Sequence, residues 1–369
     1  MSVAATAERA EEARDRTRDR RAVRIWLYAL AALVLAMVVV GGATRLTESG
    51  LSITEWNVVQ GVIPPMSEET WQEEFAKYQQ IPEYQEINRG MSLSEFKTIY
   101  WWEWSHRLLG RFIGVAFLVP FLWLLATRRI EKSLWPQLVG IFILGGLQGV
   151  AGWWMVASGL TERTDVSQYR LAVHLILASL IFAYLIWVAH GLRPQRPAAK
   201  YPASPTKRFA ELLIILLILQ LYFGALVAGL EAWRAATDWP ETAGAWVPSG
   251  MFAIEPLWRN FFENMLLVQF QHRMLAYLIA ILVVVHAVMI ARQMPGSRTA
   301  FSGYRLVAIV ALQVVIGVVT LLTAAPADIT GEVQVRIDVA LAHQAIAFIL
   351  LGGLILHRRA MHEPIPIRS

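Results

Sequence analysis

The sequence predicts an all-α integral membrane protein whose eight transmembrane helices form two pseudo-symmetric four-helix bundles. Hydrophobic residues make up 56% of the 369-residue chain and charged residues only 17%, which is too apolar for a soluble domain of this length. Apolar runs of about 20 residues recur, each long enough to cross a hydrocarbon core roughly 30 Å thick. An internal repeat in the sequence predicts the two bundles.

The connections between the predicted helices differ in length. The helices cover residues 25–43, 104–126, 134–157, 170–191, 208–230, 266–291, 304–324 and 338–357. The long outer loop 46–102 contains a stretch at 71–79 that predicts a short amphipathic helix lying on the membrane, and loops of this length usually carry function or form a lid. Proline-rich residues 193–207 predict a linker between a first half, 25–192, and a second half, 208–357.

Charge is unevenly distributed over these connections. Residues 1–24, 128–133, 193–211, 292–305 and 358–369 carry 21 of the 33 Lys and Arg but only 8 of the 28 Asp and Glu. Because Lys and Arg accumulate on the cytoplasmic side, we expect 1–24 and 358–369 to be cytoplasmic tails of a multi-pass membrane protein. We expect no cleavable signal peptide, contacts with anionic lipid headgroups, and no nucleic-acid partner.

The first half of the sequence repeats in the second. The corresponding pairs are Glu103 and Gln269, His106 and His272, Arg107 and Arg273, Gln148 and Gln313, and His174 and His343, at offsets of 165 to 169 residues. Four crossings per copy preserve the orientation of the chain, so an axis along the membrane normal should relate the two copies.

Four histidines occupy matching places near the outer ends of four predicted helices. They are His106, His174, His272 and His343. An ionisable side chain at membrane depth is a functional-site candidate by default, although each one alone could be a hydrogen-bonded core residue. Two imidazoles on opposite helices can hold a haem iron between them, so we expect the first two to face one another, and likewise the last two.

Other metal chemistry is less compatible with the sequence. A tetrahedral zinc site would need all four histidines to converge, which two separate bundles make awkward. The chain contains no cysteine, which excludes disulfides, thiolate sites and iron–sulfur clusters. The remaining histidines, His190, His286, His357 and His362, lie at inner helix ends or in the tail, and we predict them to be interface or solvent residues.

Glu103 is the second candidate for chemistry. It lies three residues before His106, on the same helical face, where a carboxylate points at the edge of whatever the histidine ligates. Its repeat partner Gln269 is an amide, so the asymmetry predicts one reactive site and one electron-transfer site. The alternative is an interfacial carboxylate paired with Arg107 or Arg45.

Four arginines are candidates for binding haem propionates. They are Arg45, Arg107, Arg111 and Arg273. Arginine offers a bidentate fork to a carboxylate; simple extension of these side chains to the membrane interface is the competing interpretation. Glycines at small-residue spacing predict close helix contacts; they are Gly41, Gly42, Gly145, Gly146, Gly149, Gly152, Gly224, Gly229 and Gly317.

Several stretches resemble the haem A synthase family of aerobic bacteria and mitochondria. They are Gly41-Gly-Ala-Thr-Arg45-Leu-Thr-Glu-Ser-Gly50-Leu-Ser-Ile-Thr-Glu-Trp56, Glu95–Arg111 around Glu103-Trp-Ser-His106-Arg107, Asn260–Asn264, Gln269–Arg273 and Ala342-His343-Gln344. The resemblance spans about residues 25–357 and is greatest to the alphaproteobacterial and mitochondrial branch. Two segments depart from the family pattern, at Glu231–Pro240 and between Pro326 and His343, which puts outer-loop details of the second half in doubt.

The resemblance implies oxidation of a methyl group of haem O to a formyl group, giving haem A for cytochrome c oxidase. By resemblance, His106 and His174 address the substrate iron, His272 and His343 ligate haem b, and Glu103 is the catalytic carboxylate. It also implies haem O synthase and oxidase assembly factors as partners, and a homo-oligomer is possible. The alternatives are a di-haem b-type electron-transfer protein, which would not need Glu103, and a transporter, for which no broken helices are evident.

Overall fold

The computed structural model describes residues 3–57, 59–161, 163–194, 202–326 and 333–361. Eight of the described helices are long and apolar enough to cross a membrane, as the sequence predicts. They are α1 (Val3–Leu46), α4 (Leu93–Ala126), α5 (Trp135–Val156), α6 (Gln168–Gly191), α7 (Ser204–Gly229), α9 (Met265–Gln293), α10 (Arg298–Leu322) and α11 (Ile337–Ala360). Apart from the starts of α1 and α4, every predicted boundary lies within six residues of the observed one.

The two exceptions are helices that extend beyond their apolar segments. Residues 3–24, predicted as a tail, form the first turns of α1, and α4 begins at Leu93 inside the predicted loop. Ser92 and Glu95 start α4 with a capping box, in which each side chain accepts a hydrogen bond from the other's backbone N–H. Apolar runs could not mark these turns, because polar residues also form helices.

The outer loop between α1 and α4 folds into a cap of short helices, α2 (Glu68–Tyr78) and α3 (Pro82–Glu86). The predicted amphipathic helix at 71–79 exists as α2, but it does not turn its apolar face toward the membrane. Instead Trp71 and Phe75 pack on Tyr100 and Phe96 of α4, with ring centroids 5.0 Å apart in both pairs. The cap is therefore anchored to a membrane-spanning helix.

Glu83 lies buried in this cap, where the Tyr78 hydroxyl donates a hydrogen bond to its carboxylate over 3.3 Å. Burial raises the pKa of Glu83 from 4.5 to about 8, against the opposing effect of the Tyr78 hydrogen bond, and repulsion from Glu103 adds to the increase. Between these two pKa values the folded cap binds a proton that the unfolded chain releases. Stability should therefore fall as pH rises from about 4.5 to 8.

Glu83→Gln should remove most of this pH dependence. The amide keeps an acceptor for Tyr78 and cannot ionise, so the variant should match the parent near pH 5 and exceed it in melting temperature near pH 9. Intrinsic fluorescence during thermal unfolding would measure the difference, and Glu86→Gln, an exposed site on the same short helix, is the matched control. Equal losses of stability at high pH in parent and Glu83→Gln would contradict the prediction.

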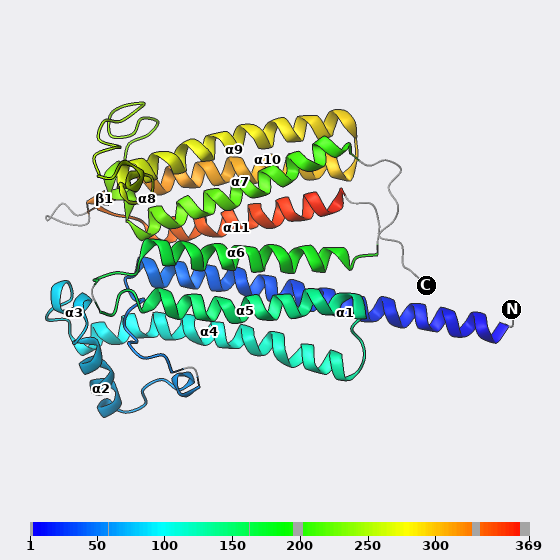
Figure 1. The fold of residues 1–369 in the computed structure, drawn as a ribbon, viewed down its shortest axis with the longest axis horizontal. Coiled ribbons are helices and arrows are strands. Elements are labelled where there is room, and N and C mark those ends of the chain that lie inside the picture. The colour runs from blue at the N-terminus through cyan, green and yellow to red at the C-terminus, as the bar shows by residue number, and fades with distance from the viewer. Residues whose placement is uncertain (1–2, 58, 162, 195–201, 327–332, 362–369) are drawn as a thin grey trace.

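The membrane helices lie side by side in two groups, with α1, α4, α5 and α6 in one and α7, α9, α10 and α11 in the other (Figure 1). The groups meet where α6 and α1 pack on α11, and α6 packs on α7. The two groups differ in one respect: α9 packs along α10, whereas the corresponding helices α4 and α5 contact one another little.

An apolar core joins the two groups across their boundary. Phe182 of α6 lies edge to face against Phe348 of α11, with ring centroids 5.4 Å apart, and Leu185, Leu351 and Leu354 are almost completely buried around them. In a bilayer such contacts stabilise the association of helices through close packing, because the apolar side chains are already out of water before the helices meet. The same buried cluster includes side chains of α4 and α9 as well, so it holds the four helices that carry the candidate histidines in one assembly.

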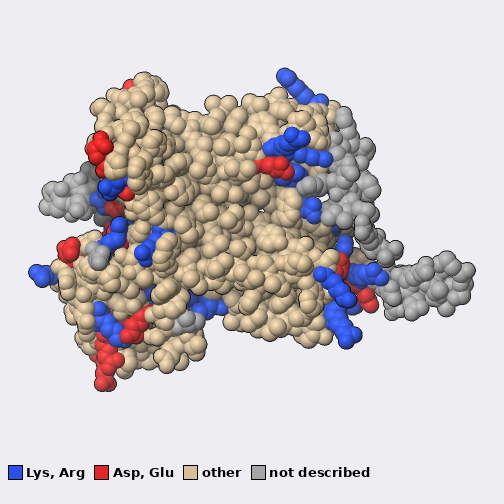
Figure 2. Space-filling view, in the orientation of Figure 1, with Lys and Arg blue, Asp and Glu red and all other residues tan. Residues whose placement is uncertain are grey.

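Charged side chains gather at the two ends of the bundle, and the band between is nearly free of them on the face in Figure 2. The end where α1 begins and α11 finishes is rich in Lys and Arg. The remaining described elements are η1 (Gln60–Val62), η2 (Lys132–Leu134), η3 (Ala232–Ala235), η4 (Leu257–Arg259), α8 (Asn260–Glu263), β1 (Ala325–Pro326) and β2 (Val333–Gln334). β1 and β2 pair antiparallel. The centre of the predicted linker, residues 195–201, and His362 lie outside the described residues.

Candidate functional site

The structure places the four candidate histidines in α4, α6, α9 and α11, toward the cap end of each helix. His272 and His343 face one another across the second group, with ring centroids 6.3 Å apart and ring planes inclined by 70°. His106 and His174 lie toward the same end of α4 and α6 in the first group. All four rings are only partly exposed, as expected for side chains that line the interior of a bundle.

Each of these rings lies against a glycine of a neighbouring helix. A Cβ added to the glycine would meet a ring atom at 3.0 Å for Gly41 and His106, 3.1 Å for Gly152 and His174, 3.3 Å for Gly224 and His272, and 2.7 Å for Gly317 and His343. Only at Gly317 is the distance below the closest approach of a real Cβ; at the other three glycines an added Cβ would press on the ring, which would have to give by a few tenths of an ångström. The four helix pairs thus present four similar recesses for an imidazole, each tighter than an ordinary side-chain contact.

Three of the four rings also have a glutamine beside them, one helical turn before the glycine. The pairs are Gln148 with His174, Gln220 with His272, and Gln313 with His343; each amide nitrogen lies 3.0–3.3 Å from both ring nitrogens. The amide oxygens of all three glutamines are buried without a hydrogen-bond partner among the described residues. The sequence carried this signal as three repeats of Gln-x-x-x-Gly, but sequence reasoning did not use it.

These features fit a haem held between two helices. Paired neutral imidazoles supply the two axial ligands of an iron, glycine backbones leave room beside the rings, and the buried amide oxygens are acceptors that an imidazole N–H could satisfy. Among the described residues, no three His, Cys, Asp or Glu side chains come together as a zinc site would need. The donor set therefore suits an iron macrocycle.

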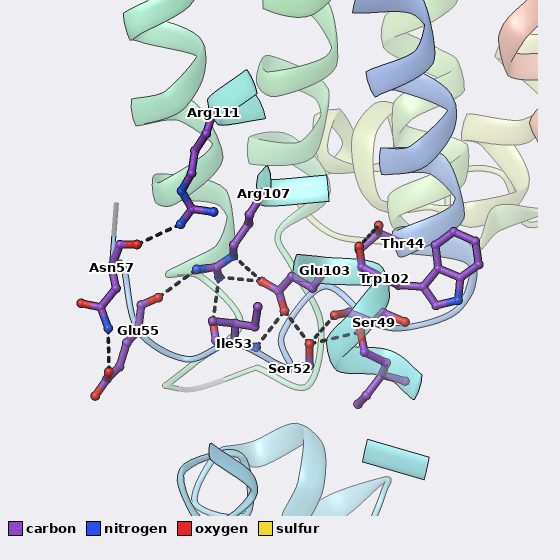
Figure 3. Close-up of polar contacts among 11 residues, drawn as sticks. Thr44, Ser49, Ser52, Ile53, Glu55, Asn57, Trp102, Glu103, Arg107 and Arg111 are labelled. Carbon is purple, nitrogen blue, oxygen red and sulfur yellow. Dashed lines mark hydrogen bonds and ion pairs between the residues drawn. The ribbon is translucent and has the colours of Figure 1, made fainter. Parts of the chain in front are cut away.

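Glu103 is buried, with 2% of its surface exposed, and its carboxylate accepts four hydrogen bonds (Figure 3). One oxygen accepts from the Ser52 hydroxyl and the Ile53 N–H, both at 2.8 Å. The other accepts from Arg107 Nε at 3.0 Å and Nη2 at 2.6 Å. The described hydrogen bonds of Glu103 thus run to the loop after α1 and to Arg107, the pairing that sequence reasoning had kept as the alternative to chemistry.

Arg107 extends this loop contact. Its guanidinium donates to the carbonyl oxygens of Glu55 at 2.8 Å and Ile53 at 2.7 Å, and lies 5.5 Å from the centre of the Trp56 ring. Arg111, one turn further along α4, donates to the carbonyl of Asn57 at 2.8 Å (Figure 3). Together these side chains hold residues 52–57 over the outer end of α4.

The second half repeats this arrangement with an amide in place of the carboxylate. Gln269 is 3% exposed; its nitrogen donates to the Ala236 carbonyl at 2.8 Å, and its oxygen accepts from Arg273 at 3.4 Å. Arg273 also donates to the Glu241 carbonyl and the Thr242 hydroxyl, both at 2.9 Å. An amide can therefore occupy this position and still hold the loop.

The four arginines predicted as propionate ligands all contact protein acceptors. Arg45 forms a 3.4 Å ion pair with Glu231, which links the end of α1 to the loop after α7, while Arg107, Arg111 and Arg273 bind loop carbonyls. Propionate contact stays a prediction for these residues, and positioning of the outer loops is the role that their described hydrogen bonds support.

The prediction that the inner histidines are interface or solvent residues is wrong for two of them. His286 and His357 are each 1% exposed, and their Nε2 atoms lie 3.0 Å apart between α9 and α11. The Ser302 hydroxyl lies 2.5 Å from Nδ1 of His357. Their position near basic helix ends predicts that these histidines are exposed to solvent. Instead α9, α10 and α11 converge there and bury both side chains. His190 is partly exposed and lies 3.2 Å from the Tyr28 hydroxyl.

The fold and the paired imidazoles define a multi-pass membrane protein with side chains suited to haem. Within that class the chain belongs to the COX15-CtaA family, described as cytochrome oxidase assembly proteins, whose model matches residues 24–355. Membership agrees with the resemblance that the sequence motifs carried, and eight apolar spans in a family member of bacterial type make this a multi-pass protein of the bacterial inner membrane.

Similar proteins extend over nearly the whole chain. A protein of Chelativorans sp. strain BNC1 named "Heme A synthase" is 52% identical over 349 residues, which are 95% of this chain and 93% of that one. Proteins with the same name from Allorhizobium ampelinum and Bradyrhizobium diazoefficiens are 48% and 52% identical, and cover 100% and 90% of this chain and 99% and 89% of their own lengths.

Proposed function

We propose that this protein is a haem A synthase, which oxidises a methyl group of haem O to a formyl group to give haem A for cytochrome c oxidase. The observation that carries the proposal is the pair of imidazole sites at one end of the bundle, with a buried carboxylate next to only one of them, in a chain about half identical to proteins of that name. The reaction hydroxylates one carbon twice; each step oxidises that carbon by two electrons, which pass to an external electron acceptor, and loss of water from the resulting diol gives the aldehyde.

The two halves of the protein bind different haems in this proposal. His106 and His174 address the iron of the substrate haem O in the first half, and His272 and His343 ligate haem b in the second. Haem b, when bound, would supply electron transfer, and His272 and His343 would hold its iron. The close second-half pair, 6.3 Å between ring centroids, supports a resident cofactor there.

Glu103 is the residue proposed to take part in the chemistry. Its carboxylate is held by Ser52, Ile53 and Arg107 at the outer end of α4, one turn from His106. A preorganised, buried carboxylate stabilises positive charge that develops at a nearby carbon and can accept a proton there. Arg107 and the loop hydrogen bonds would keep the carboxylate oriented during turnover.

Topology and partners complete the proposal. The excess of Lys and Arg at the end where α1 begins supports cytoplasmic termini and a periplasmic cap. The haem sites then lie toward the periplasmic side. Haem O synthase and oxidase assembly factors are the proposed partners. The protein could meet these partners as a monomer or as a homo-oligomer.

A purified sample tests the proposed function directly. The protein, incubated with haem O in detergent micelles with an electron acceptor, should yield hydroxylated haem O and haem A, which are separated by reversed-phase chromatography and identified by mass. The rival is a di-haem b-type electron-transfer protein, which would carry two haem b groups and leave added haem O unchanged. That result would overturn the proposal.

A further inference from the structure

We propose that a glutamine beside both imidazoles makes the haem of a site resident, and that Met37, which stands where the glutamine beside His106 would be, makes the haem of the first half exchangeable. The inference rests on the proposed function, which assigns the substrate to the first half. Gln148, Gln220 and Gln313 are positioning residues in this scheme, and they act on the iron through the histidines.

Position 37 is where the fourth glutamine would stand. Gln148, Gln220 and Gln313 each precede the glycine behind their histidine by four residues, and Met37 precedes Gly41 by the same interval. The Met37 methyl group lies against α4, 3.2 Å from where a Cβ on Gly110 would be, one turn from His106. The recess of His106 therefore has a thioether where the other three recesses have an amide.

The amide has a specific task when iron is bound. An imidazole that gives its Nε2 lone pair to iron carries its proton on Nδ1, and that N–H needs an acceptor. The amide oxygens of the three glutamines are buried and unpartnered within the described residues. The amide nitrogens of Gln148 and Gln220 also donate to the backbone carbonyls of His174 and His272, at 3.2 and 3.0 Å. When iron holds Nε2, rotation of the amide about its last bond would exchange that hydrogen bond for one in which the amide oxygen accepts from Nδ1, fixes the ring and strengthens the ligand.

Met37 cannot provide this hydrogen bond at a comparable strength, because a thioether is only a weak acceptor. The ring of His106 also lies differently: its Nε2 is the atom nearest Gly41, whereas Cε1 is nearest the glycine in the other three recesses. His106 should therefore be the most weakly held of the four ligands. A substrate must enter and a product must leave, so a weak ligand suits the substrate site, and paired glutamines suit a permanent haem at His272 and His343.

Haem dissociation measures this difference without turnover. The full-length protein, loaded with haem b at both sites, is mixed with excess apomyoglobin, which captures released haem and changes its absorbance. The wild-type protein should release haem in a fast and a slow phase. Met37→Gln should slow the fast phase by roughly tenfold, and Gln220→Met should accelerate the slow phase by a similar factor, the usual range for partners of metal-bound histidines.

The controls separate hydrogen bonding from packing. Methionine and glutamine have similar length and volume, so a packing role would leave both rates unchanged. Met37→Leu, apolar for apolar, should leave the fast phase as it is. Gln220→Glu keeps an oxygen acceptor with more charge, so it should retain the slow phase and lower the midpoint potential of the resident haem.

Each result bears on the inference separately from the proposed function. Unchanged rates in both Met37→Gln and Gln220→Met, or equal acceleration by Gln220→Met and Gln220→Glu with no shift in potential, would overturn it. If Met37→Gln does not fold, the Gln220 variants still decide. A wild-type protein that binds haem at both sites but never converts haem O would overturn the proposed function and leave the dissociation comparison intact.

Discussion

Glu103→Gln is expected to retain bound haem but to convert haem O at least about 100-fold more slowly, the lower bound of the usual contribution of a general acid or base. The substitution removes the charge and the proton acceptor and leaves the side chain almost the same size. Gln269 occupies the corresponding position in the second half and still holds its loop through Ala236 and Arg273, so an amide there is compatible with the fold.

The first half is nevertheless not identical, because one carboxylate oxygen of Glu103 accepts from Ser52 and Ile53, where the amide nitrogen of Gln269 donates to a carbonyl. An amide at 103 leaves one buried donor without a partner, which costs about 1–3 kcal/mol. Ser52→Ala weakens the same loop contact but keeps the carboxylate, so it is the matched control and should lose much less activity. Equal losses in both variants would make Glu103 a loop anchor only.

The measurement is product analysis alongside the reduced haem spectrum. A bis-imidazole spectrum of wild-type intensity in Glu103→Gln, with haem O or its alcohol accumulating, would support the chemical role. Gln269→Glu is a second control: it places a carboxylate beside the site proposed for the cofactor and should leave conversion unchanged. Full turnover by Glu103→Gln would remove the residue from the mechanism.

Gly317→Ala is expected to empty the second haem site nearly as effectively as His272→Ala, although it removes no ligand. The added methyl group would meet Cε1 of His343 at 2.7 Å, the tightest of the four glycine contacts. The ring must then shift by several tenths of an ångström away from its place opposite His272. Bound metal tolerates such displacement poorly, and we expect roughly 10- to 100-fold weaker haem retention, the range seen when partners of metal ligands are changed.

Gly149→Ala is the matched control, since a Cβ at this position of α5 meets nothing within 4 Å. It carries the same change in helix propensity, which favours alanine, without any contact to an imidazole. Haem content per protein, measured as the pyridine complex, compares the three variants. Retention of wild-type haem by Gly317→Ala would show that the ring can move without loss of the ligand, and retention by His272→Ala would show that this ligand assignment is wrong.

Hydropathy and the repeat predicted most of the fold, since length and apolarity alone specify a membrane-spanning helix. The apolar pattern could not locate the start of α4, which depends on the local hydrogen bonds of Ser92 and Glu95, nor the apolar support of α2, whose partners Phe96 and Tyr100 lie about 25 residues away along the chain. Contacts between distant segments leave no periodic signal.

For the site, the equal depth of the four histidines in their helices predicted them as ligands, because ligands of cofactors bound at one level of the membrane must lie at that level. What surrounds them was harder to foresee. Charge alone predicts that Arg107 and Arg273 bind propionates, whereas their described hydrogen bonds include ones to loop carbonyls. Gln220 and Met37 carry no charge and have apolar neighbours in the sequence. Their proposed roles therefore follow only from their positions in the structure, beside an imidazole or one helical turn from it.

The weak contact between α4 and α5, set against the close packing of α9 on α10, makes the two halves mechanically unequal. Parting two helices requires free energy in proportion to the interlocked side chains that must separate. The side wall formed by α4 and α5 is therefore the softer one, and it encloses the half proposed to bind the substrate, a bulky lipophilic molecule that would enter and leave once per catalytic cycle. The stiffer wall, formed by α9 and α10, encloses the half proposed to keep its haem.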